Sequence, residues 1–156
     1  MGAIDADAHV IETVQTWSYL EEDERRFTPQ LMTQTFGADL LSNEGTAVRD
    51  FWVIEGRAHG KDRNVGTNTP QESREMLSVE ARLAHMDALG IETQVLYPTL
   101  FLRPVVQEAE RERALCKSYN HWMGDLWRQG KGRLRWVAKP PLQFLDKAPV
   151  LVREEL

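Results

Sequence analysis

The order of extended and helical segments constrains the fold of this chain more than any other feature. Segments typical of strands lie near residues 4–10, 93–97 and 134–138, and helical patterns precede the second and the third. Strands that alternate with helices pair in parallel through right-handed crossovers. The sequence therefore predicts an α/β fold with about three parallel strands that are neighbours in sequence order.

The first of these segments carries the candidate chemistry. Polar and apolar residues alternate from residue 4 to residue 10, which is typical of a strand with one polar face, formed here by Asp5, Asp7 and His9. A solvated edge strand shows the same alternation, but such strands more often carry Lys, Thr or Glu than three potential metal ligands. We therefore treat this face as a candidate site.

Asp7 and His9 are two positions apart, so both side chains should leave the same face, with Ala6 and Ala8 on the opposite face. A carboxylate beside an imidazole suits a divalent metal: zinc first, with manganese or iron as alternatives. Two ligands are a weak signal by themselves, because hydrolytic metal sites generally have at least three protein ligands. The spacing predicts part of a metal site.

Residues 11–68 show no clear period. We expect a long, mostly irregular excursion with short helices, and a short hairpin around the turn residues Glu55 and Gly56. Segments of this length usually act as lids or binding loops, and a merely tolerated insertion is the alternative. His59 lies in this excursion and is a candidate to approach the site.

Two helices are expected between the strands. Thr69, Pro70 and Glu72 are typical of an N-cap, a first helical position and a capping box, and the helix they open is expected to break near Ser78. Its core stripe consists of Met76, Val79, Leu83 and Met86, and Gly90 marks its end. A second helix should open at Pro104 and run to Gly130, with a buried stripe of Leu115, Tyr119, Trp122 and Leu126. The tail from 146 to 156 has helical character.

Composition narrows the classes of function. A chain of 156 residues favours one domain spanning 1–156, and a net charge of -5 gives no indication of a nucleic-acid partner. No apolar run reaches the ~18 residues that cross a membrane. The acidic net charge instead favours a small-molecule substrate. The single cysteine, Cys116, forms no intramolecular disulfide, so we expect a reducing, cytoplasmic setting.

Several segments resemble amidohydrolase-related proteins, the branch of the amidohydrolase superfamily that includes aminocarboxymuconate-semialdehyde decarboxylase and related aromatic-acid decarboxylases. The segments that carry the resemblance are 4–12, 80–91, 94–99, 119–122 and 135–143. The resemblance implies the N-terminal portion of a (β/α)8 TIM-type barrel, in which Asp7 and His9 take the places of the paired first-strand ligands. The superfamily often has His where this chain has Asp7, which leaves the identity of the metal open.

Relatives of this kind complete the site with His, His and Asp from the fifth, sixth and eighth strands. By the resemblance, the catalytic residues are expected on those strands, which the 156 residues do not include. The chain is therefore expected to be the N-terminal part of a longer protein or a truncated frame, and to hold metal weakly by itself.

The leading functional hypothesis is a metal-dependent hydrolase that acts on an amide, ester or lactone. A nonoxidative decarboxylase on the same metal site is the first alternative. The second is a noncatalytic fragment or a half-barrel that forms a homo-oligomer.

Four further residues are candidates for the surroundings of the metal or the substrate pocket: Glu12, His59, Tyr97 and Thr99. Glu12 either orients His9 or is solvated, whereas Tyr97 and Thr99 lie where barrel loops line a substrate pocket. We expect His85, His121 and Cys116 to be surface or packing residues.

Overall fold

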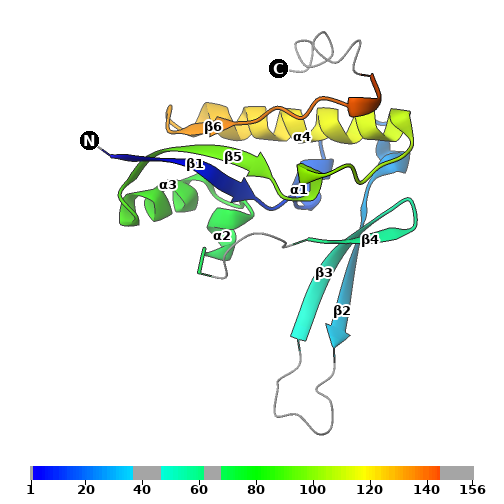
Figure 1. Cartoon of the computed structure of the whole chain (residues 1–156), viewed down its shortest axis with the longest axis horizontal. Helices are drawn as coiled ribbons and strands as arrows, with labels where there is room; N and C mark the ends of the chain where they lie inside the picture. Colours follow the sequence, from blue (N-terminus) through cyan, green and yellow to red (C-terminus); the bar gives the residue numbers. More distant parts are fainter. Residues whose placement is uncertain (1, 37–46, 62–67, 145–156) are drawn as a thin grey trace, which may run out of the picture.

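A computed structural model describes residues 2–36, 47–61 and 68–144, and its central element is a three-stranded parallel sheet (Figure 1). The strands are β1 (Ala3–Val10), β5 (Ile91–Pro98) and β6 (Leu134–Trp136). They lie in the order β1-β5-β6, and both pairings are parallel. The predicted parallel sheet in sequence order is confirmed, with a third strand two residues shorter than expected.

A bulge in β1 divides its polar residues between the two faces of the sheet. Asp5 pairs with Gln94, whereas Ala8 pairs with Leu96, so three steps along β1 match two along β5. The extra residue places the side chains of Asp5 and Ala8 on one face and that of His9 on the other. The expectation that Asp5 shares a face with Asp7 and His9 is therefore wrong, because strict alternation assumes a regular strand.

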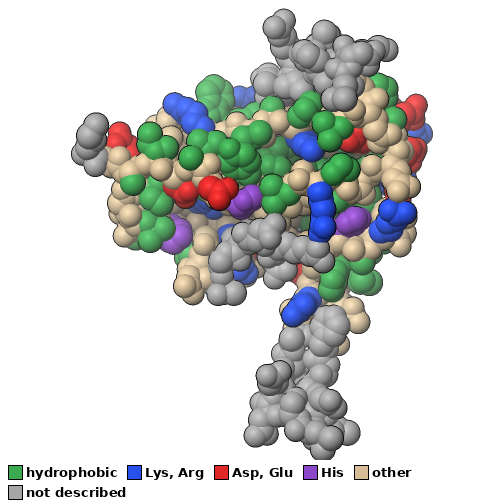
Figure 2. All heavy atoms as spheres, viewed as in Figure 1, with side chains coloured by type: hydrophobic (Ala, Val, Ile, Leu, Met, Phe, Trp, Pro, Cys, Tyr) green, Lys and Arg blue, Asp and Glu red, His purple; other side chains and the backbone are tan. Residues whose placement is uncertain are grey.

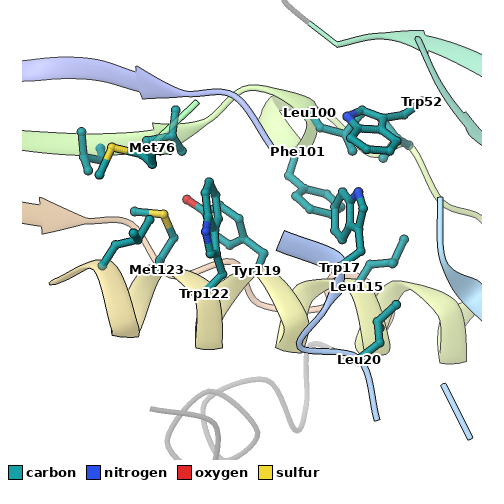
Figure 3. Close-up of a cluster of buried hydrophobic side chains, with 14 of the residues drawn as sticks. Trp17, Leu20, Trp52, Met76, Leu100, Phe101, Leu115, Tyr119, Trp122 and Met123 are labelled. Carbon is teal, nitrogen blue, oxygen red and sulfur yellow. The ribbon is translucent and has the colours of Figure 1, made fainter. Parts of the chain in front are cut away.

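Two helices cover the face of the sheet on which Leu96 and Leu134 are buried. They are α3 (Val79–Ala88) and α4 (Ala109–Gln129). Both predicted stripes are confirmed as core: Met76, Val79, Leu83 and Met86 in one, and Leu115, Tyr119, Trp122 and Leu126 in the other. Figure 3 shows how side chains of α4 meet Phe101 and Trp17 in the same cluster.

The helix expected from Thr69 is two helices, α2 (Gln71–Arg74) and α3, with the predicted break between them. Pro70, not Thr69, is the N-cap of α2, and no side chain caps this helix. The hydroxyl of Ser78 instead accepts a hydrogen bond from the Ala81 amide and caps α3. Gly90 has a φ of +70° directly after the end of α3, as a helix stop requires.

The second helix begins at Ala109 rather than at the predicted Pro104. Leu100–Leu102 form a short 3₁₀ helix, η2, before it. The N-terminal amides of Gln107 and Glu108 are satisfied by the carboxylate of Glu55, each at 2.9 Å. A capping group from a distant hairpin therefore fixes where α4 begins, and no local pattern reveals it.

The excursion after β1 is not mostly irregular, as the sequence suggested. It contains an antiparallel sheet of β2 (Gln30–Phe36), β3 (Ala47–Ile54) and β4 (Arg57–Gly60), besides the short α1 (Val14–Trp17) and the 3₁₀ turn η1 (Arg25–Phe27). Residues 31–35 are exposed on both faces of β2, so this strand needs no alternation of apolar and polar residues. The sequence therefore lacks the pattern by which a strand is recognised. In Figure 1, β2 and β3 form a ribbon that extends away from the parallel sheet.

The predicted hairpin at Glu55 and Gly56 is confirmed. Their φ angles of +50° and +72° match a two-residue turn of type I′. The expected helical tail from 146 lies outside the described residues, which end with the 3₁₀ turn η3 (Leu142–Phe144). No helix in the described part of the chain is both long and apolar enough to cross a membrane.

Arg82 connects the helices to the strand that carries the candidate site. Its side chain is buried, and its Nε donates to the Gln94 side chain at 2.8 Å. One terminal nitrogen donates to the carbonyl oxygens of His9 at 3.3 Å and Ser73 at 3.2 Å. Burial lowers its pKa to about 10, so Arg82 stays cationic at neutral pH.

We expect Arg82→Ala to lower the free energy of unfolding by about 3 kcal/mol, because three buried acceptors lose their donor. Urea unfolding measures the loss. Arg128→Ala is the matched control, since this exposed arginine forms an ion pair with Asp125 one turn away and with no other residue that the structure describes, and it should cost less than about 1 kcal/mol. Equal losses in the two variants would contradict the role given to Arg82.

Candidate metal centre and adjacent pocket

Asp7 and His9 approach each other at the carboxyl end of β1. The Nε2 atom of His9 lies 3.8 Å from Oδ1 of Asp7. The His9 side chain is 14% exposed and that of Asp7 is 95% exposed, so the pair is supported on one side and open on the other. Figure 2 shows acidic side chains beside a histidine over this end of β1. Both side chains leave the same face, opposite Ala8, as the spacing predicts.

The histidine ring is oriented by the neighbouring strand. Nδ1 of His9 lies 3.3 Å from the carbonyl oxygen of Pro98, the last residue of β5. A carbonyl only accepts hydrogen bonds, so we infer that Nδ1 carries a proton; in the tautomer that has this single proton, the lone pair lies at Nε2. The ring of Tyr97 lies beside it, with centroids 6.0 Å apart. This is the arrangement by which metal-binding histidines are held.

The distance between the two donor atoms can be compared with a metal site. Two ligand atoms at about 2.0–2.2 Å from a tetrahedral ion lie roughly 3.4 Å apart. The observed 3.8 Å is slightly longer, and the Asp7 side chain is exposed and therefore free to turn towards an ion. Within residues 2–36, 47–61 and 68–144, no three His, Cys, Asp or Glu side chains come together as a metal site. The described residues therefore fit a metal as two of its ligands.

Glu12 is buried and does not orient His9. Its carboxylate accepts hydrogen bonds from the Leu100 amide at 3.0 and 3.2 Å, at the start of η2. The solvated alternative is wrong, because the residue is fully inaccessible. Desolvation raises its pKa to about 7, against the opposing effect of the backbone hydrogen bonds. The Pro98 carbonyl, and not Glu12, is the hydrogen-bond partner of His9. Because every residue has a backbone carbonyl, the sequence does not indicate this partner.

The other sequence candidates divide between the metal pair and a neighbouring pocket. Tyr97 lies against His9, whereas Thr99 is buried and donates from Oγ1 to the Val10 carbonyl at 2.7 Å. Thr99 and His59 are brought together in the wall of a cavity of about 330 Å³. Its lining consists of His59, Gly60, Thr99, Leu100, Leu102, Arg103 and Val105.

Arg103 is a charged lining residue that the sequence did not single out. It follows η2 in a segment without a clear period, so nothing local distinguished it from other surface arginines. His85 and His121 are half-buried on α3 and α4, and Cys116 is fully buried in α4, as expected for surface or packing residues.

No family model and no curated protein sequence matches this chain. The structure is similar to that of an amidohydrolase from Mycobacterium avium subsp. paratuberculosis K-10, with a TM-score of 0.64 and 18% sequence identity. The similarity covers 99% of this chain and 45% of the amidohydrolase. The chain thus has an amidohydrolase-like fold and spans less than half the length of that protein.

The buried carboxyl of Glu12 leads to a prediction about pH. Its pKa of about 7 in the folded state exceeds the ordinary 4.5, so between these values the unfolded chain loses a proton that the folded chain keeps. This contribution to the free energy of unfolding is present at low pH and is lost as the pH rises towards 7. The facing Tyr119 stays neutral, because burial first and the charge of Glu12 second raise its pKa.

Glu12→Gln cannot ionise and should lack this contribution. Urea unfolding at pH 5 and pH 8 should therefore show the wild-type chain losing about 2 kcal/mol more than the variant as the pH rises. Comparing the two proteins removes the effect of all other titrating groups. A difference between them that is independent of pH would contradict an ionisable, buried Glu12.

Proposed function

We propose that this chain belongs to a metal-dependent hydrolase that acts on a small carbonyl compound: an amide, an ester or a lactone. The observation that carries the proposal is the Asp7–His9 pair, with His9 held by the Pro98 carbonyl so that Nε2 lies near the carboxylate. The amidohydrolase-like fold supports this choice of reaction. Asp7 and His9 would hold the metal, zinc first and manganese or iron as alternatives.

Each part of the pair has a defined task. The Pro98 carbonyl holds the proton on Nδ1 of His9, and the Asp7 carboxylate adds negative charge on the open side. The bulge in β1 places Asp5 on the opposite face of the sheet. There its Oδ2 accepts a hydrogen bond from the Gln94 side chain at 2.9 Å. When bound, a divalent cation would polarise the substrate carbonyl and lower the pKa of water towards neutrality.

In the part of the chain that the structure describes, no helix covers one face of the parallel sheet, and this supports a barrel. Ile4 is 70% exposed and Val137 is 37% exposed, although parallel sheets are usually buried on both faces. In Figure 2, hydrophobic side chains gather over the region of β5 and β6. We propose that this face is the interior of a (β/α)8 barrel, in which further strands supply the remaining ligands and the catalytic acid or base.

Metal binding tests the assignment of the two ligands. We expect the chelator-treated chain to bind Zn²⁺ weakly, because two ligands leave the coordination shell open, and His9→Ala or Asp7→Asn to weaken binding at least about tenfold. Titration calorimetry measures the affinities. His121→Ala is the control, because this half-buried histidine lies on α4 and is not part of the Asp7–His9 pair. Unchanged affinity in both site variants would overturn the assignment.

Turnover tests the reaction. The 156-residue chain, and a form extended by the downstream reading frame, are each loaded with zinc, manganese or iron(II) and incubated with matched amide, ester and lactone substrates, and with carboxylic acids to detect release of carbon dioxide. We expect metal-dependent hydrolysis in the extended form only, because the remaining ligands and the catalytic acid or base are expected on further strands. In that form chelation should remove the hydrolysis and His9→Ala should lower it roughly 100-fold, while His121→Ala retains it. Hydrolysis that persists in His9→Ala, or release of carbon dioxide in its place, would overturn the proposal.

A further inference from the structure

We propose that the cavity between β4 and η2 binds a small molecule that bears a carboxylate, and that Arg103 is the group that holds this carboxylate. The inference deepens the proposed function, on which it rests only for the reaction of the bound molecule. The binding of the carboxylate itself needs no metal. It would narrow the substrate class to amides, esters or lactones with an acidic substituent.

The cavity has the size and lining of a site for a small molecule. Its volume of about 330 Å³ is in the range of small-ligand pockets. Leu100, Leu102 and Val105 offer an aliphatic surface for the body of the ligand, and Thr99 and His59 add polar atoms. An apolar wall with few polar groups orients a ligand whose one end is charged.

The charge of the cavity is positive. Among the described residues, none that lines the cavity is acidic, and Arg103 forms no ion pair with any of them. Other cations near these segments are neutralised: Lys61 by Glu75 at 2.9 Å, and Arg111 by Glu55 at 3.6 Å. A guanidinium group presents parallel N–H donors that match a carboxylate. An anion is therefore the ligand that this cavity favours.

Both walls of the cavity are fixed to the core before a ligand binds. The β3–β4 turn is held by Glu55 on the amides of Gln107 and Glu108, while Trp52 of β3 packs edge-on against Trp17 at 5.7 Å. Figure 3 shows Leu100 and Trp52 together in this cluster. Because this wall is already ordered, little conformational entropy is lost when a ligand binds.

The opposite wall, formed by Thr99 and η2, is held by hydrogen bonds to buried groups. Thr99 is tied to the Val10 carbonyl, and the Leu100 amide is tied to the buried Glu12 carboxylate. These residues directly follow Pro98, whose carbonyl oxygen binds His9. The cavity and the metal pair therefore both adjoin the end of β5.

The test uses a matched pair of probes on the full chain after chelation of metals: cyclohexanecarboxylate and its neutral amide, cyclohexanecarboxamide. We expect the carboxylate to bind about tenfold more tightly, with chemical-shift changes at the amides of Thr99, Leu100 and Val105 in NMR titrations. Arg103→Gln should remove the preference, and Arg103→Lys should retain part of it. Arg25→Gln, which replaces an exposed arginine outside the cavity lining, should leave it unchanged.

Equal affinity for the two probes would overturn the inference, as would equal losses in Arg103→Gln and Arg25→Gln or shift changes away from the cavity. His9→Ala separates this inference from the proposed function. If His9→Ala has no effect on zinc binding but the carboxylate preference depends on Arg103, the metal assignment fails and the anion site stands. If zinc binding depends on His9 and the carboxylate preference is absent, the anion site fails alone.

Discussion

The buried guanidinium of Arg82 is the interaction on which the arrangement of the site depends. A cation without access to water is costly unless every donor finds an acceptor, and Arg82 finds them on α2, β1 and β5. The nearest compensating charge is Asp5, which reaches Arg82 through Gln94 and raises its pKa against the effect of burial. The bulge in β1 is what turns Asp5 towards the helices. The same bulge leaves Asp7 and His9 on the open face, so one irregularity separates the carboxylate bound to Gln94 from the carboxylate beside His9.

The parts of the fold that the sequence predicts are those with local, periodic causes. The stripes of α3 and α4 repeat at helical spacing, and the β-branched and aromatic residues of 93–97 favour a strand, so both elements and their parallel pairing could be expected. The ribbon of β2 and β3 could not, because a strand exposed along residues 31–35 needs no apolar alternation. The start of α4 depends on Glu55, more than fifty positions earlier, and a local pattern contains nothing of such a cap.

The same division holds within the candidate site. Asp7 and His9 are visible because a spacing of two places both side chains on one face. The partner of His9 is a backbone carbonyl, and Glu12 is buried because a backbone amide 88 residues away satisfies it. Every residue has the same backbone groups, so the sequence does not show which amide or carbonyl will bind a side chain. Only tertiary contacts distinguish the buried Glu12 carboxyl from a solvated one. The place of Arg103 in the cavity also depends on tertiary contacts, because the facing wall, with His59 and Gly60, comes from β4.

The position of that hairpin favours a binding segment over a merely tolerated insertion as the interpretation of the excursion. A merely tolerated insertion needs no contact with the carboxyl end of the sheet, whereas β4 supplies His59 and Gly60 to the wall of the cavity beside Thr99. Its turn holds the first amides of α4, and Trp52 is fully buried against Trp17, so the excursion is integrated into the core at both places. A segment with these contacts cannot be removed without exposing the α4 amides and opening the cavity. The excursion therefore lies at the carboxyl end of the sheet, where β4 and the segment that follows β5 line the cavity together.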